Sequence, residues 1–231
     1  MQLARLVTGA DLNRHPAARL GAVLDAVAGV HALADAPAAR VEALAVFTGQ
    51  GEQWRLSQAF DRWNTSTTLR LLLIADGNPA ERTYEPLSPA YLRDLGLRRT
   101  EGVVVQSEPA PNTGLQAAWT ARCIQQRDVR SLALAVTPYH LPRAYLTLLA
   151  ACTAASLRLP VLPLPTPVPA GTRMPETAAT EAELLPGEIE RILVYADRGW
   201  VADPAAFAEY LSWLHAAHGW IWDDRSVGPS R

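Results

Sequence analysis

The sequence predicts an α/β fold: a three-layer sandwich in which helices cover both faces of a mostly parallel sheet of about five strands. Two observations support this prediction. Short, nearly continuous apolar runs alternate with segments of helical periodicity along most of the 231 residues. Hydrophobic residues make up 49% of the chain and charged residues 19%, which is enough apolar material for one large core. Extra helices are expected at both ends of the chain.

The expected elements follow one another in a regular order. The first helix with clear apolar periodicity covers residues 16–30. The strand candidates are the apolar runs 43–48, 69–75, 102–106, 131–137 and 158–164. Further helices are expected over 56–63, 88–95, 112–127, 142–155, 187–198 and 203–217.

These elements indicate one domain with four segments. Residues 1–40 are expected to be an N-terminal helical segment packed on the core, and residues 41–165 to form the sheet domain. Residues 166–186 are rich in Pro, Thr and Ala, which is typical of a surface loop. Residues 187–231 are expected to supply the C-terminal helices that complete the same domain.

Charge and residue types exclude several classes of function. The net charge is −2, and the pI is about 6.2, which argues against a nucleic-acid partner. All 21 basic residues are Arg. Because Walker A loops, pyridoxal Schiff bases and protein kinase sites need Lys, these chemistries are excluded. The absence of Lys beside abundant Ala, Leu, Arg and Pro is typical of a high-GC bacterial genome.

The cysteines and the apolar segments indicate where the protein resides. Cys123 and Cys152 form no CxxC pattern, so we expect buried free thiols in a reducing compartment. The longest mostly apolar helix is expected near residues 145–155, about half of the roughly 20 residues a bilayer needs. We therefore expect a soluble, cytoplasmic protein without a membrane anchor. His215 and His218 are too few for a metal site, so none is assigned.

Polar residues follow four of the expected strands. Ligands of parallel sheets bind outside the carboxyl ends of the strands, so these residues are the candidate site for a small-molecule ligand. They are Gly49, Gly51, Asp76, Gly77, Asn78, Glu108, Asn112, Thr113, Thr137, Tyr139, His140 and Arg143.

The densest cluster contains His140 and Arg143, which share a face at the start of an expected helix. His140 is the candidate general acid or base, and Arg143 can clamp a phosphate or carboxylate. Glu108 or Asp76 would orient His140 or activate water. The structural alternative is that His140 caps the helix and Arg143 pairs with a surface acid.

Three other features have both a functional and a structural interpretation. Asn112 or Thr113 caps a helix, and the same helix start offers amide groups to an anion. The run 49–51 is a Gly-x-Gly fragment without the third glycine of the dinucleotide fingerprint, which disfavours NAD. Trp200, Trp213, Trp220 and Trp222 form either a platform that stacks a base or, as we favour, a seam that holds the terminal helices.

Two runs of the sequence carry motifs about 25 residues apart. The first is Pro-Asn-Thr-Gly-Leu-Gln-Ala-Ala at 111–118, and the second is Leu-Ala-Val-Thr-Pro-Tyr-His-Leu-Pro-Arg-Ala at 134–144. Together they resemble motifs of the YdcF/SanA/ElyC-like family of unknown function. The likeness extends over about 41–198. Residues 48–51 resemble the family's early Gly-rich strand end, and residues 75–77 are similar to the end of its second strand. Glu108 lies where the family commonly has an acid, and residues 187–189 resemble the opening of its C-terminal helix. The matching motif residues are Asn112, Thr113, Thr137, Tyr139, His140, Arg143 and Ala144. The chain departs from the family at Leu115, where an acid is usual, and at Asn78, where a glycine is usual.

The resemblance implies a Rossmann-like sheet with a polar pocket at its carboxyl edge, and a nucleotide-like ligand for which S-adenosylmethionine is the first candidate. Three hypotheses follow. The first is an enzyme, a hydrolase or group transferase, that acts on a phosphorylated or nucleotide-like small molecule. The second, which the missing acid at Leu115 favours, is a non-catalytic module that binds a nucleoside ligand, and the third is an interaction protein.

Overall fold

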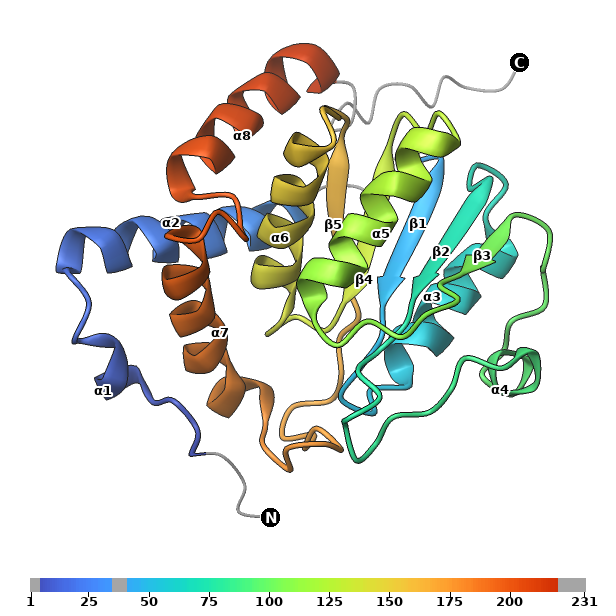
Figure 1. The fold of residues 1–231 in the computed structure, drawn as a ribbon, viewed down its shortest axis with the longest axis horizontal. Helices are drawn as coiled ribbons and strands as arrows, with labels where there is room; N and C mark the ends of the chain where they lie inside the picture. Colours follow the sequence, from blue (N-terminus) through green and yellow to red (C-terminus); the bar gives the residue numbers. More distant parts are fainter. Residues whose placement is uncertain (1–4, 35–40, 220–231) are drawn as a thin grey trace, which may run out of the picture.

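The computed structural model describes residues 5–34 and 41–219. Its centre is a five-stranded parallel sheet in the order β3-β2-β1-β4-β5 (Figure 1). The strands are β1 (Ala43–Phe47), β2 (Leu71–Ala75), β3 (Val103–Val105), β4 (Leu132–Val136) and β5 (Val161–Pro165). The predicted α/β, Rossmann-like three-layer architecture is therefore confirmed.

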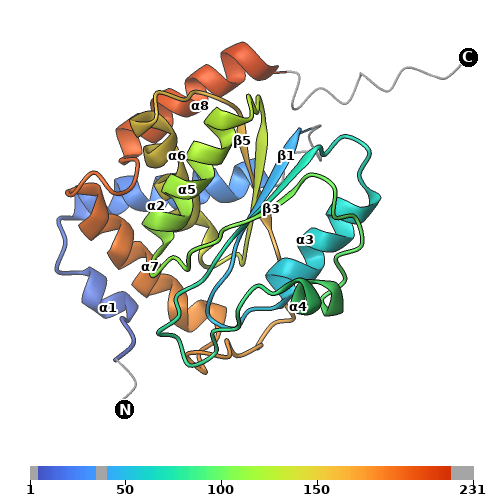
Figure 2. The same cartoon turned by 45° about the vertical axis from the view of Figure 1, so that its right-hand side comes forward.

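Helices cover both faces of the sheet (Figure 2). One face carries α5 and α6, which pack against each other, and the other carries α3. The helices are α1 (Gly9–Leu12), α2 (Ala17–Ala34), α3 (Trp54–Thr65), α4 (Pro89–Asp94), α5 (Thr113–Gln126), α6 (Leu141–Ala154), α7 (Glu181–Ala196) and α8 (Pro204–His218). Because both faces are covered, every residue of β1, β2 and β4 is buried, which explains their continuous apolar runs.

The start of α7 differs from the sequence prediction. The helix begins at Glu181 and not near residue 187, so the expected loop over 166–186 ends six residues early. Thr180 and Glu183 form a capping box, with Glu183 accepting from the Thr180 backbone N–H at 2.7 Å. The helix begins at this cap although Pro186, which has no backbone N–H to donate, lies inside it.

The longest apolar helix also differs from the prediction. By length and composition α2, with a mean hydropathy of 1.4, is the one helix among the described residues that could cross a membrane. Core helices of soluble proteins and signal sequences have the same properties. In this fold α2 packs against β5, α6, α7 and α8, and buries Val23, Ala26, Val27, Val30 and Leu33.

Two smaller expectations concern the cysteines and tryptophans. Cys123 and Cys152 are free and buried, as predicted. Trp213 packs against the core beside Tyr210, whereas Trp200 is 54% exposed, so only the first fits the expected seam. Trp220 and Trp222 lie outside the described residues.

The strand order determines where a ligand can bind. The chain runs outward from β1 to β2 and β3, and then crosses to β4 and β5 on the other side. Open α/β sheets bind ligands at this switch point, beyond the carboxyl ends of the central strands. Here the ends of β1 and β4 lie side by side, and α6 starts directly after β4.

Candidate functional site

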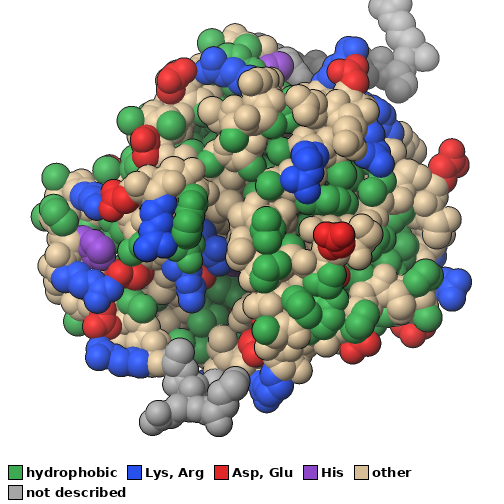
Figure 3. All heavy atoms as spheres, in the orientation of Figure 1, with side chains coloured by type: hydrophobic (Ala, Val, Ile, Leu, Met, Phe, Trp, Pro, Cys, Tyr) green, Lys and Arg blue, Asp and Glu red, His purple; other side chains and the backbone are tan. Residues whose placement is uncertain are grey.

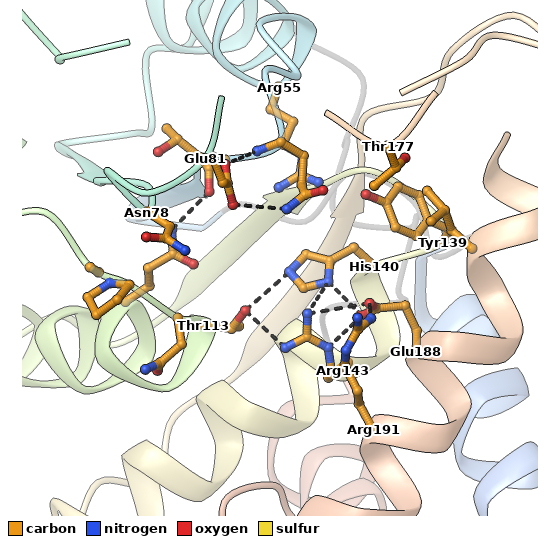
Figure 4. Close-up of a pocket in the computed structure, with 18 of the residues that line it drawn as sticks. Arg55, Asn78, Glu81, Thr113, Tyr139, His140, Arg143, Thr177, Glu188 and Arg191 are labelled. Atoms are coloured by element: carbon orange, nitrogen blue, oxygen red, sulfur yellow. Dashed lines mark hydrogen bonds and ion pairs between the residues drawn. The ribbon is translucent and has the colours of Figure 1, made fainter. Parts of the chain in front are cut away.

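A polar cavity of about 260 Å³ lies at the carboxyl ends of the strands. The loops after β1 and β2, the starts of α5 and α6, and α7 contribute its walls (Figure 4). Arg side chains gather over α7 beside a hollow on this side of the molecule (Figure 3). Seven of the predicted site residues line the cavity: Gly49, Asn78, Asn112, Thr113, Tyr139, His140 and Arg143.

His140 is held from one side by a carboxylate. Its Nδ1 lies 2.8 Å from Oε2 of Glu188, and its Nε2 lies 3.5 Å from Oγ1 of Thr113. Since an ionised carboxylate only accepts hydrogen bonds, Nδ1 carries the proton and donates it to Glu188. The lone pair of a neutral ring is then on Nε2, which faces Thr113.

The surroundings of His140 favour the neutral ring. The side chain is 7% exposed, and this burial is the main reason that its pKa falls to about 4. The nearby guanidinium of Arg143 lowers the pKa further, while Glu188 acts in the opposite direction. At neutral pH the imidazole is therefore available as a proton acceptor at Nε2.

Glu188 is a buried carboxylate with two guanidinium partners. Arg143 donates through Nε at 2.5 Å and Arg191 through Nη1 at 2.5 Å. Burial opposes the charge, but Arg143, His140 and Arg191 together hold the pKa of Glu188 well below its usual range. Two cations around one anion leave this wall of the cavity with net positive charge.

Thr113 and Asn112 lie at the start of α5. The side chain of Asn112 accepts from the Leu115 amide at 3.0 Å, which is an N-cap, as the structural interpretation predicts. This cap places Thr113 in the first turn, where its Oγ1 accepts from Nη1 of Arg143 at 3.0 Å. Leu115 is 49% exposed and does not line the cavity.

A second ion pair lies beneath the cavity. Glu52 and Arg55 are 4% and 2% exposed, with Nε of Arg55 donating to Glu52 at 2.9 Å. Thr137 donates to the same carboxylate, and the hydroxyl of Tyr139 donates to it at 2.6 Å. Thr137 is fully buried and does not line the cavity, so the structure places it in support of Tyr139 and Arg55 and out of a ligand's reach.

Three predicted residues line a separate hollow of about 30 Å³ next to the cavity. They are Gly51, Asp76 and Gly77. Gly51 has φ +68°, and a Cβ there would lie 2.7 Å from Cβ of Thr83, so this glycine is required by the backbone and the packing. Asp76 accepts from the hydroxyl of Tyr84 at 3.0 Å, and burial raises its pKa.

Glu108 does not reach the cavity. It is exposed on the loop after β3, and the carboxylate that orients His140 is Glu188. The expected orientation of His140 by Glu108 or Asp76 is therefore wrong, and the activation of water by one of these carboxylates stays a prediction. Glu188 had one sequence signal, its place in the resemblance to the family's C-terminal helix, but nothing in its local pattern indicated a contact with His140.

Other cavity residues were not singled out from the sequence. Gln116 donates through Nε2 to the carbonyls of Thr48 at 2.9 Å and Asp76 at 2.8 Å, which ties α5 to the ends of β1 and β2. Glu81 accepts from the Gln50 amide at 2.6 Å, and burial raises its pKa. These contacts shape the wall opposite Arg143.

Two loops over the cavity are bound together by Glu176. Its carboxylate accepts from the Thr83 amide at 2.9 Å, the Thr83 hydroxyl at 2.7 Å and the Arg82 amide at 3.1 Å. The loop that precedes α7 is thereby joined to the loop that follows β2. Both loops contribute cavity residues, namely Thr177, Asn78 and Glu81.

A larger cavity, of about 330 Å³, lies between α6, α8 and the start of β5. Its thiol, Cys152, has a pKa raised to about 12 by burial, and Arg158 pairs with Glu209 at 3.5 Å. This cavity does not bring together groups suited to acid–base chemistry. Among residues 5–34 and 41–219, no group of three or more His, Cys, Asp or Glu side chains could hold a metal ion.

Comparison with protein-family models and with curated proteins finds no match for this chain.

Proposed function

We propose that the chain is an enzyme, a hydrolase or group transferase, that acts on a small phosphorylated or nucleotide-like molecule in the cavity at the carboxyl edge of the sheet. The observation that carries this proposal is the orientation of His140. Glu188 occupies Nδ1, which leaves Nε2 as a base within the cavity.

The charges of the cavity support an anionic substrate. Arg143 and Arg191 surround Glu188 on one wall, and the first turn of α5 adds backbone amides that helices leave without partners. A phosphate near Thr113 would meet both. At about 260 Å³ the cavity is slightly smaller than the roughly 300–1,000 Å³ of typical ligand pockets, which favours a small molecule over a dinucleotide.

S-adenosylmethionine fits these residues poorly. Its sulfonium is a cation, whereas the wall formed by Arg143, Arg191 and Glu188 carries two guanidinium groups around one carboxylate. A non-catalytic module that binds a small anion is the second candidate, because the same guanidinium groups can hold an anion without a reaction.

We also propose that the chain is related to the YdcF/SanA/ElyC-like family and that it is soluble and cytoplasmic. The first proposal is supported by convergence: Asn112, Thr113, Tyr139, His140 and Arg143 carry the resemblance, and all line one cavity. The second is supported by the packing of α2 against the sheet and three helices.

The test is a screen of phosphomonoesters, sugar phosphates and nucleotides for thermal stabilisation and for turnover. Substitution His140→Gln should lower turnover by roughly 100-fold to 10,000-fold. The matched control is His15→Gln, because His15 also pairs with a carboxylate, Glu190, at 2.8 Å, but does not line the cavity. Equal turnover of the two variants would refute the role of His140, and binding without turnover would favour the binding module.

A further inference from the structure

We propose that Thr113 is the nucleophile of this site, and that the reaction passes through a covalent phosphothreonine at Thr113. The inference rests on the proposed function and deepens it: it replaces an activated water in the first step by a side chain. Three features of the described chain support it.

The first feature is the environment of the Thr113 hydroxyl. Arg143 donates to Oγ1 through Nη1 at 3.0 Å, and Nε2 of His140 lies 3.5 Å from the same oxygen. The guanidinium occupies one lone pair, so the hydroxyl proton is free to turn toward the imidazole. A hydroxyl that accepts from a cation and donates to a base is an activated nucleophile, and such contacts tighten when substrate binds.

The second feature is the order of the three groups. Thr113, His140 and Glu188 form a chain in which each polar side chain contacts the next, at 3.5 Å and 2.8 Å. This is the arrangement of a nucleophile, its base and the carboxylate that orients the base. Thr113 lies at the start of α5, His140 directly before α6, and Glu188 within α7, and all three line the cavity.

The third feature is that two other hydroxyls of the cavity already donate to acceptors elsewhere. Thr48 donates to the carbonyl of Ala75 at 2.9 Å, and Tyr139 donates to Glu52 at 2.6 Å. Both protons are directed away from His140. The hydroxyl of Thr113, in contrast, lies 3.5 Å from Nε2 of His140, the proposed base, and lines the cavity.

The reaction balances without a metal or a redox partner. Oγ1 of Thr113 attacks the phosphorus of a phosphate ester, its proton passes to Nε2 of His140, and the bond from phosphorus to the leaving oxygen breaks. The leaving oxygen takes the proton from the imidazolium. Water then attacks the phosphothreonine, gives a proton to His140, and the bond between phosphorus and Oγ1 breaks as Thr113 recovers its proton.

Labelling with diisopropyl fluorophosphate tests the proposal without knowledge of the substrate. Attack by an activated hydroxyl forms an oxygen–phosphorus bond and releases fluoride, and peptide mass spectrometry locates the label. We expect the folded protein to be labelled at Thr113, and His140→Gln to slow this labelling roughly 100-fold or more. Thr113→Ser should still be labelled at position 113. Absence of label at Thr113, or equal labelling in His140→Gln, would overturn the proposal.

Turnover of Thr113→Val separates this proposal from the proposed function. Valine keeps the shape of threonine and removes the hydroxyl, and the melting temperature checks that the variant folds. If Thr113→Val and His140→Gln both lose turnover of a phosphomonoester found in the screen, the covalent route is supported. If Thr113→Val retains turnover while His140→Gln loses it, His140 activates water, so the nucleophile is wrong and the proposed function stands.

Discussion

Nδ1 of His140 donates to Oε2 of Glu188 at 2.8 Å, although 48 residues separate the two along the chain. The contact joins the start of α6 to the middle of α7. The contact fixes which nitrogen of the ring carries the proton. The carboxylate of Glu188 also neutralises part of the charge of Arg143 and Arg191. The chemistry of the cavity and the packing of α7 therefore depend on one carboxylate.

The first prediction concerns removal of this charge. Substitution Glu188→Gln leaves Arg143 without its buried partner, so the free energy of unfolding should fall by roughly 3 kcal/mol. The matched control is Glu190→Gln on the same helix. Its partners are His15 and Arg14, and because Arg14 is 60% exposed the substitution leaves no buried guanidinium behind, so we expect a loss of about 1 kcal/mol. Urea denaturation measures both. A loss at Glu188 no greater than at Glu190 would contradict the assigned pairing.

The second prediction concerns pH. The pKa of His140 is lowered from 6.5 to about 4 in the folded protein, so the unfolded chain binds a proton at a higher pH than the folded chain does. Stability should therefore be complete above about pH 6.5 and decline as the pH falls toward 4, by an amount on the order of 3 kcal/mol. The lowered pKa of Glu188 adds a further loss at more acidic pH.

Denaturation curves measured between neutral and acidic pH check this dependence, with His140→Gln for comparison. The variant should lose less stability than the wild type between pH 6.5 and 4, because its glutamine does not titrate. The acid limb of turnover should likewise fall well below pH 6.5. An acid limb near 6.5 would show that the folded ring titrates like an exposed histidine.

The third prediction concerns the ion pair beneath the cavity. Substitution Glu52→Gln leaves the buried guanidinium of Arg55 without its counter-ion and should cost roughly 3–5 kcal/mol. Adding Arg55→Met removes the stranded charge, so the double variant should be more stable than the sum of the two single losses predicts. A double-mutant cycle of unfolding free energies measures this coupling. Simple additivity would mean that the two side chains act independently.

The fourth prediction compares two glycines that flank the segment before β3. Gly102 has φ +81°, and a Cβ there would lie 2.5 Å from the carbonyl oxygen of Arg70, whereas Gly96, with φ +102°, has open space around it. Both alanine substitutions strain the backbone, by about 1 kcal/mol or more. Gly102→Ala should cost clearly more, because it also displaces Arg70, directly before the start of β2. Equal melting temperatures for the two variants would argue against this close approach.

The strands were predictable because each is a short apolar run, and the covered parallel sheet followed from them. The start of α7 was missed, because Pro, Thr and Ala over 166–186 indicate a loop. The signal that could have found it is the capping-box pattern from Thr180 to Glu183. The polar residues after β1 and β4 converge because adjacent parallel strands end at one edge.

The orienting carboxylate was misassigned for a physical reason. Glu108 is close to Asn112 along the chain, but the loop after β3 carries it into solvent. Glu188 reaches His140 through the packing of α7 against α6, which the local pattern of either helix does not specify. The roles of Gly51 and Thr137 were misjudged similarly, because a residue at a strand end can serve the backbone or the layer beneath as readily as a ligand.

The bonds from Glu176 to Arg82 and Thr83 have a kinetic consequence. They join the loop that precedes α7 to the loop that follows β2. Separating these loops to admit a bulky molecule requires three hydrogen bonds to break together. The speed at which molecules come and go should therefore respond to a change at Glu176, even though this side chain takes no part in the bond-making beneath it.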